Sequence, residues 1–263
     1  MDCDYPEIIH VSHAHCGLSE RGLVEPELAL ASLKKSLKLL EAAACSHVAI
    51  PCNSLHPLLP ALQDETPMQL LDMVHSCCLA VQEATMRLPG CVVVLGSDST
   101  KKSDIFIEPL RKLGVNCVSA DKQVQILTDT HILQAMKEGS TPALRQRLQR
   151  LIEHAAKIAT RSMRTELAAS TNISGSSILA ARPFQVTVVL GCTELSLLST
   201  ENPRTWPCPV PVGSLNVDIQ VVDSMSSLVN TTVAAYHQYK SVSNAAGTAQ
   251  PSNTHKSPVK EIY

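Results

Sequence analysis

Aromatic side chains are scarce in this 263-residue chain, where one Trp, four Tyr and two Phe make up 3% of the residues. The core must therefore be built from aliphatic side chains. No apolar run approaches the ~18 residues that a membrane-spanning helix needs, and the acidic start, MDCDYPE, lacks the apolar segment of a secretory signal. A net charge of -2 offers no basic excess for nucleic acid. We expect a globular protein that binds neither membranes nor nucleic acids.

Cysteine, in contrast, is abundant, with ten residues. A chain of this size can fold without disulfides, and no export signal is visible, so we expect free thiols and a cytoplasmic location. The stretch HVSHAHC holds His10, His13, His15 and Cys16. It has no second ligand pair at a spacing typical of zinc sites, and we assign no metal to it.

Two kinds of apolar segment alternate along the chain. Short continuous runs, typical of buried parallel strands, predict strands at residues 7–13, 47–52, 91–96, 115–120 and 187–192. Apolar residues at helical spacing predict helices at residues 25–46, 69–88, 103–114, 144–162 and 223–239. This alternation predicts an α/β fold with parallel sheets.

Breaks in the alternation indicate the domain organisation. Residues 163–183 are rich in Ser, Thr, Asn and Ala, which indicates an exposed insertion between a helix and a strand. Residues 241–263 contain few apolar side chains, which is typical of a disordered tail. We assign residues 1–87 and 214–240 to one lobe and residues 88–213, including the insertion, to a second.

Two cysteines stand apart because each directly follows a predicted buried strand. Cys52 ends VAIPC and Cys192 ends VVLGC, and polar residues follow both. In open α/β sheets, functional residues gather at the carboxyl ends of strands. The N–H groups of a helix start lower the pKa of a nearby thiol from ~8.5 and also bind carboxylates. Two such thiols can remove a proton from one face of a carbon and return one to the other face.

These segments resemble the two signature segments of the aspartate/glutamate racemase superfamily, nearest to its aspartate racemase branch. The first, CNSLH, has Ser54 where the family usually has Thr, and the second, GCTEL, matches the family without change. The segments GSDSTKKSDIF, QAMKEG and QVVDSM resemble further parts of the family. The resemblance extends over residues 5–238.

The resemblance implies two similar doubly wound lobes with parallel sheets and an active site in the cleft between them. It implies an isomerase that racemises an acidic amino acid, above all aspartate, without a cofactor or a metal. A small-molecule amino acid is then the expected partner, and a homodimer is compatible with this activity. The implied residues are Cys52 and Cys192 as acid/base thiols, Asn53, Ser54, Thr100, Lys137 and Thr193 as substrate-binding groups, and His56 and Glu194 as groups that support them.

The sequence departs from the family at its start. Members usually begin with a strand that ends in a Gly-Gly-Met-Gly-Pro type loop, and this sequence has no such segment. We therefore expect the sheet of the first lobe to be one strand short, or to have a neighbouring segment in place of the missing strand. Two functions remain open. One is an amino-acid racemase or a close relative, such as a hydantoin racemase or a maleate isomerase. The other is a catalytically degenerate protein of this fold that binds a small acid or a partner.

Overall fold

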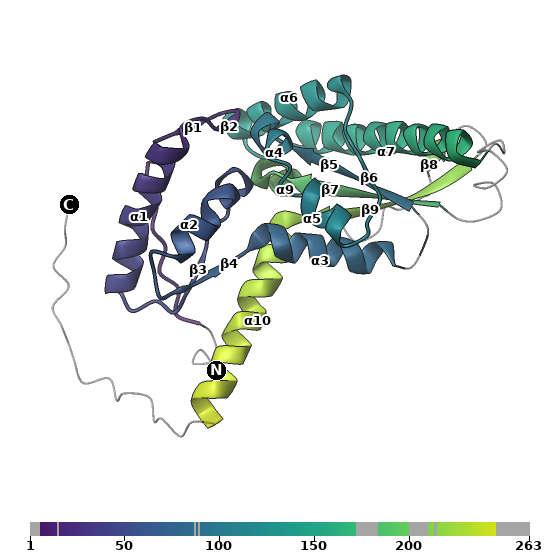
Figure 1. Ribbon diagram of the computed structural model, residues 1–263. Coiled ribbons are helices and arrows are strands. Elements are labelled where there is room, and N and C mark those ends of the chain that lie inside the picture. Colours follow the sequence, from purple (N-terminus) through teal and green to yellow (C-terminus); the bar gives the residue numbers. More distant parts are fainter. Residues whose placement is uncertain are drawn as a thin grey trace.

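The computed structural model describes residues 6–14, 16–86, 88, 90–171, 184–199, 210–212 and 215–245. These residues form an α/β protein of two lobes (Figure 1). Lobe one comprises residues 16–71, lobe two comprises the described residues from 73 to 223, and the last helix runs between them. The predicted α/β class with parallel sheets is confirmed. Within the described ranges, no helix is long and apolar enough to span a bilayer.

Lobe one is a small sheet covered by helices. Strands β3 (His47–Ala49) and β4 (Gln69–Leu71) pair in parallel. Helix α1 (Pro26–Ala42), a 3-10 helix (Asn53–Leu58) and helix α2 (Leu59–Gln63) pack their apolar side chains together with these strands. Helix α1 forms where the sequence predicts it, because its leucines recur at helical spacing and its proline lies in the first turn.

Lobe two is built on a five-stranded sheet with the order β6-β5-β7-β9-β8. Four strands are parallel: β6 (Cys117–Val118), β5 (Gly90–Gly96), β7 (Phe184–Gly191) and β9 (Leu215–Asp223). The edge strand β8 (Val210–Val212) is antiparallel to β9. Every residue of β7 is buried, as expected for a continuous apolar strand that is covered on both faces.

Helices cover both faces of the five-stranded sheet. One face packs against α3 (Met73–Thr85) and α5 (Ile107–Lys112). The other face packs against α6 (Lys122–Glu138), α7 (Pro142–Thr171) and α9 (Thr193–Leu198). Because both faces are apolar and covered, lobe two has a doubly wound core on either side of its sheet.

The direction of winding changes between β5 and β7. From β5 the chain reaches β6 through α5, on one face of the sheet, and it returns from β6 to β7 through α6 and α7, on the other face. Gly96 and Gly191 are paired at the carboxyl ends of β5 and β7. In open α/β sheets, ligands bind at such a topological switch point.

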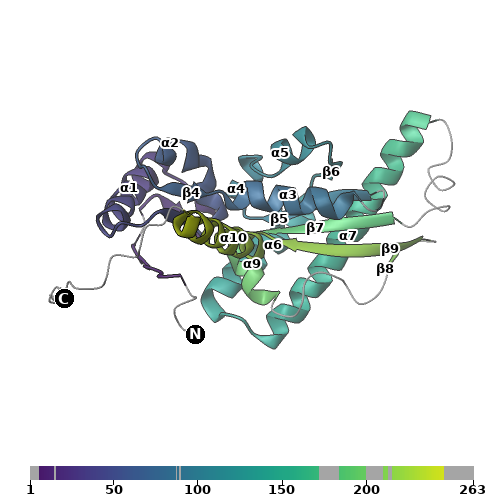
Figure 2. The same cartoon turned by 90° about the horizontal axis from the view of Figure 1, so that it is seen from below.

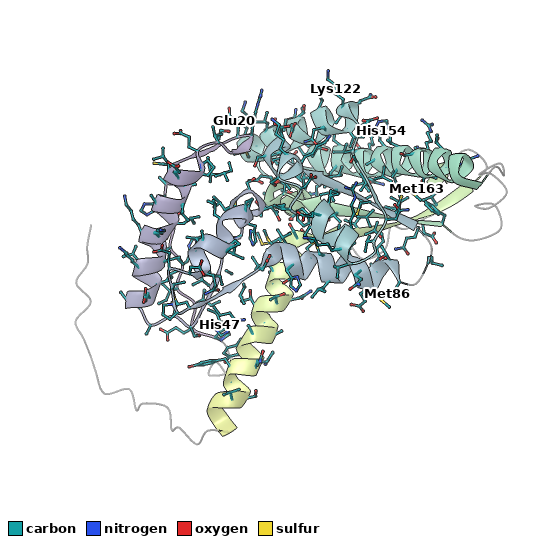
Figure 3. The ribbon with its side chains drawn as sticks, viewed as in Figure 1. Glu20, His47, Met86, Lys122, His154 and Met163 are labelled. Carbon is teal, nitrogen blue, oxygen red and sulfur yellow. The ribbon has the colours of Figure 1, made fainter. Side chains whose placement is uncertain are left out.

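Helix α10 (Ser224–Ala245) starts directly after β9 and connects the two lobes by packing. Figure 2 shows it nearly end-on, between lobe one and the strands of lobe two. Its Leu228 packs against Leu71 of lobe one. Further along α10, the ring of Tyr239 packs edge-on against the ring of His47, at the start of β3. Figure 3 labels His47 beside α10.

A short hairpin lies where lobe one meets α4 (Asp98–Lys102) (Figure 1). It consists of β1 (Leu18–Ser19) and β2 (Gly22–Leu23), and Figure 3 labels Glu20 in its turn. The backbone N–H of Leu23 donates a hydrogen bond of 3.1 Å to the Oγ of Ser99, in α4. The hairpin therefore bridges the lobes beside the carboxyl end of β5.

Some predicted elements differ from the observed ones. Residues 7–13 form no strand, and Ile8 remains 77% exposed. The helix expected at residues 69–88 begins only at Met73, because the preceding residues pair with β3. Asp72 follows that strand and caps the helix by accepting a 2.8 Å hydrogen bond from the N–H of His75.

The expected insertion and tail also require correction. Residues 163–171 continue α7, and the side chain of Met163 is buried in the core; the rest of the expected insertion lies outside the described residues. Residues 241–245 complete α10, and the rest of the expected tail lies outside them too. Composition alone did not show that the first part of this segment continues the helix.

The hydrogen-bonded sheets divide the chain differently from the expected lobes. Strand β9 was expected in lobe one with residues 214–240, but it pairs with β7 in the sheet of lobe two. Helix α3 was expected in lobe one with residues 1–87, but it packs on that same sheet. The two-stranded sheet of lobe one is correspondingly small.

Candidate active site

Cys52 lies where lobe one's chain turns from strand β3 into the 3-10 helix. Its backbone is extended, with φ -152° and ψ 108°, and the helix begins at the next residue. The side chain is largely buried against the core of lobe one. Burial raises the pKa of Cys52, hydrogen bonding from the backbone of Leu55 lowers it, and the negative charge of Glu194 raises it further.

Cys192 occupies the matching position after β7, with φ -147° and ψ 135° before α9. Its Sγ donates a hydrogen bond of 2.9 Å to Oε2 of Glu194, and the hydroxyl of Thr193 donates one of 3.1 Å to the same oxygen. Burial and the adjacent Glu194 carboxylate raise the pKa of Cys192, and charge on Cys52 raises it further. The two thiols therefore lie within electrostatic reach of each other, although they come from different lobes.

The expectation that helix starts lower both thiol pKa values is wrong for this structure. Backbone hydrogen bonds act in the expected direction at Cys52 and at Cys192. Burial acts against them and is the larger effect at both sites, since a thiolate loses its hydration there. Both groups are therefore protonated thiols near neutral pH.

Asn53 connects the Cys52 turn to the other lobe. Its Nδ2 donates a 3.0 Å hydrogen bond to the Oγ of Ser224 at the start of α10. Its Oδ1 is buried and has no hydrogen-bond partner among the described residues. A buried acceptor without a partner is costly, and one beside a thiol suits a ligand that brings a donor.

Hydroxyl groups continue this network toward lobe two. The Oγ of Ser54 lies 3.3 Å from that of Ser97, which lies 3.0 Å from Oγ1 of Thr100. All three side chains are buried. Gly22 of the hairpin lies so close to this network that a Cβ there would be 2.8 Å from the Oγ of Ser54. Thr100 also lines a cavity of about 130 Å³.

The ring of His56 links the Cys52 turn to the start of α3, with one ring nitrogen on each side. The N–H of Met73 donates a 3.1 Å hydrogen bond to Nε2, so this nitrogen carries no proton. The other nitrogen, Nδ1, lies 2.9 Å from the carbonyl oxygen of Cys52 and donates to it. Burial lowers the pKa of His56, in agreement with a neutral ring.

Lys137 is the predicted site residue that the structure does not bring to the others. It lies exposed in the last turn of α6. The same helix contacts the site through Gln125, whose Nε2 donates a 2.9 Å hydrogen bond to the carbonyl oxygen of Gly96. At 1.5 Å per residue, Lys137 lies about 18 Å further along the axis.

Three residues that hydrogen-bond to the thiol-bearing turns were missing from the predicted site: Ser97, Ser224 and Asp223, which bonds to Ser196 of α9. Asp223 ends β9 and Ser224 begins α10. A polar pair directly after an apolar run is the signal that identified both cysteines, and the same signal was available at VVDS.

Metal ligands are not clustered in the described part of the chain. No group of three or more His, Cys, Asp or Glu side chains there has the arrangement to hold a metal ion. His15, from the histidine-containing stretch, lies outside the described residues.

Fold and site together define a two-lobed α/β protein with one thiol from each lobe at the carboxyl end of a strand. The sequence profile of the family described as Asp/Glu/Hydantoin racemase matches residues 1–160. The chain belongs to this family, as its signature segments predict.

Individual relatives are distant. The broad specificity amino-acid racemase RacX of Bacillus subtilis (strain 168) is 21% identical over 244 residues, which cover 91% of this chain and 86% of that protein. The structure of an aspartate racemase homologue from Pyrococcus horikoshii OT3 has a TM-score of 0.51 and 18% identity, covering 80% of this chain and 75% of that one. The Picrophilus torridus aspartate racemase has a TM-score of 0.50 and 16% identity, covering 79% and 70%. These structures show the shared fold, and the family supports an amino-acid racemase that acts on small amino-acid substrates.

Proposed function

We propose that this protein interconverts the enantiomers of an acidic amino acid, aspartate first, by proton transfer between the α-carbon and two thiols. The observation that supports this most is the pairing of Cys52 and Cys192. They have the same extended backbone before a helix, come from different lobes, and lie within electrostatic reach of each other. Two acid/base groups on opposite sides of one carbon are what inversion without a cofactor needs.

Proton transfer starts with formation of a thiolate. Glu194 is hydrogen-bonded to the thiol of Cys192 and takes its proton. The thiolate removes the α-proton from one face of the substrate, and the thiol of Cys52 delivers its proton to the opposite face. Cys52 is then the thiolate, from which the reverse reaction begins. Before another turnover in the same direction, Glu194 releases its extra proton to water and Cys52 takes up one proton from water, which restores the starting state. Charge that develops on the substrate carboxylate is stabilised by N–H groups at the starts of the two helices.

Substrate binding follows from the unpaired and buried polar groups. The free Oδ1 of Asn53 accepts a hydrogen bond from the substrate ammonium group. Ser54, Thr100 and Thr193 supply hydroxyls around the same space. We do not include Lys137, because of its exposed position at the far end of α6.

Exchange of the α-proton in heavy water tests this proposal. The protein is incubated with a panel of D- and L-amino acids, without pyridoxal phosphate or added metal, and deuterium at the α-carbon is followed by NMR or mass spectrometry. We expect exchange of both enantiomers of aspartate, faster than that of neutral amino acids. Exchange of no amino acid at all would contradict the proposal.

A second candidate is a non-catalytic protein that binds a small acid at this site. The raised pKa of both thiols favours it, because neither is a ready base in the free protein. Calorimetry with aspartate discriminates the two functions: binding with no α-proton exchange would identify a binding protein.

A further inference from the structure

We propose that the junction of β9 and α10, formed by Asp223 and Ser224, is a clasp that sets the spacing between the two thiols. The inference rests on the proposed function, in which both thiols act on one carbon. Each thiol belongs to a separate lobe, so some connection has to hold one relative to the other. The Ser54–Ser97 and Leu23–Ser99 hydrogen bonds also cross between the lobes. Asp223 and Ser224 differ from them because these two consecutive residues hold both thiol-bearing turns.

The first half of the clasp holds lobe one. Ser224 is 0% exposed, and its Oγ accepts the 3.0 Å hydrogen bond from Nδ2 of Asn53, which is 3% exposed. Asn53 directly follows Cys52 and begins the 3-10 helix. A shift of Ser224 therefore moves the turn that carries the first thiol, or breaks a fully buried hydrogen bond.

The second half holds the turn of lobe two. The hydroxyl of Ser196 hydrogen-bonds to Oδ1 of Asp223. Ser196 lies one turn after Cys192 in α9, where its N–H donates a 3.2 Å hydrogen bond to the carbonyl oxygen of Cys192. Asp223 thus holds the helix that starts at the second thiol.

The clasp itself is fixed by the first turn of α10. The N–H of Met225 donates a 3.1 Å hydrogen bond to Oδ1 of Asp223, and the hydroxyl of Ser226 donates one of 2.7 Å to Oδ2. These bonds orient the carboxylate but reach neither thiol turn. Ser226 is exposed, so its substitution provides a matched control.

Positioning matters here because proton transfer across a single carbon tolerates little error. Misplacement of a reacting group by about 1 Å can cost a factor of about a hundred in rate. Asp223 and Ser224 form no hydrogen bond with either sulfur; they act through Asn53 and Ser196. They are positioning residues, and their substitution should change kcat more than KM.

Cross-linking measures the spacing without relying on activity. Wild type, Ser196→Ala, Ser224→Ala and Ser226→Ala are treated with dibromobimane, which bridges neighbouring thiols, and the Cys52–Cys192 product is quantified by peptide mass spectrometry. We expect Ser196→Ala and Ser224→Ala to reduce its yield about fivefold, the population change that one buried hydrogen bond supports. Ser226→Ala should give the wild-type yield. Monobromobimane should label both thiols at wild-type rates in all four proteins, which separates spacing from accessibility.

Equal cross-link yields in all four proteins would overturn the clasp, and so would a loss in Ser226→Ala as large as in the other two variants. A yield that falls only in Ser196→Ala and Ser224→Ala supports it. If the variants show that pattern but the wild-type protein exchanges no α-proton, the clasp is supported and the proposed function fails.

Discussion

The thiol of Cys192 donates a hydrogen bond to the carboxylate of Glu194, with 2.9 Å between Sγ and Oε2. The carboxylate has two opposing effects on this thiol. Its charge and its hydrogen bond raise the pKa of Cys192, in addition to burial. The same oxygen is also an acceptor in direct contact for the thiol proton. A thiolate therefore forms at Cys192 only when the proton moves to Glu194 or to water.

Substitution Glu194→Gln should separate these two effects. Loss of the negative charge lowers the pKa of Cys192, so alkylation of this thiol by iodoacetamide near pH 8 should become faster. The expected gain is about threefold for each unit by which the pKa falls, because the larger thiolate fraction is partly offset by lower nucleophilicity. Racemisation should become slower, because the proton acceptor is lost. Peptide mass spectrometry gives the alkylation rate and polarimetry gives racemisation. If both rates fall together, Glu194 is not the group that raises the thiol pKa.

Asn53 should determine whether a ligand with an ammonium group is preferred. In Asn53→Ala the free Oδ1 is lost, and a hydrogen bond to a charged group is worth about 1.5–3 kcal/mol. Aspartate should therefore bind about tenfold to a hundredfold more weakly by calorimetry. Succinate, which has the same two carboxylates without the amine, should lose less affinity than aspartate, because for succinate only the effect of the broken Asn53–Ser224 hydrogen bond remains. An equal loss for both ligands would show that Asn53 does not bind the ammonium group.

His56 should make the folded state less stable in mild acid. Burial holds the pKa of His56 below its ordinary value of 6.5. As the pH falls through that value, the unfolded chain binds a proton at this residue that the folded protein does not, so the free energy of unfolding decreases. His56→Asn cannot titrate but keeps a donor for the Cys52 carbonyl oxygen. Between about pH 7.5 and pH 5.5 it should lose less stability than wild type, by up to about 1.4 kcal/mol per pH unit.

Urea unfolding at both pH values checks this, with His75→Asn as the control. His75 lies exposed on α3, so its variant should retain the wild-type pH dependence. A His56→Asn variant with an unchanged dependence would show that the ring is not held neutral.

Gly22 should be required for the hairpin to lie against the site. Its φ of +100° disfavours other residues, and a Cβ would be 2.6 Å from the Oγ of Ser99. Gly22→Ala should therefore lift the hairpin and speed amide hydrogen exchange of Leu23, whose N–H donates to Ser99. Gly114→Ala is the matched control, because Gly114 has φ +76° with nothing within 4 Å of the added Cβ. Equal protection of Leu23 in all three proteins would contradict this account of Gly22.

Local sequence patterns predicted most of the fold. Continuous apolar runs identified β5 and β7, and leucine spacing identified α1. Both patterns depend only on which residues within one short segment are buried. The same patterns failed for Gln69–Leu71, a strand only because β3 lies beside it. They also failed for residues 7–13, where an apolar run forms no strand. Pairing between strands that are distant in the sequence cannot be predicted from a local pattern of residues.

The positions of the two thiols could be predicted from the sequence, but their electrostatics could not. Cys52 and Cys192 could be found because each follows a buried strand with polar residues behind it. Their raised pKa values depend on how deeply each sulfur is buried and on the rotamer that brings Glu194 to Cys192, and neither is visible in the sequence. The link from Asn53 to Ser224 spans 171 residues, and only the folded chain reveals it.

The central claim is that Cys52 and Cys192 serve opposite faces of one α-carbon. The most direct measurement is α-proton exchange in heavy water for each enantiomer of aspartate separately, with Cys52→Ser and Cys192→Ser beside the wild type. A serine hydroxyl is far too weak an acid to replace a thiol, so racemisation should fall by orders of magnitude in both variants. Exchange of one enantiomer should fall more in Cys52→Ser, and exchange of the other should fall more in Cys192→Ser. Wild-type racemisation by the double serine variant, or the same enantiomer bias in both single variants, would contradict the two-thiol account.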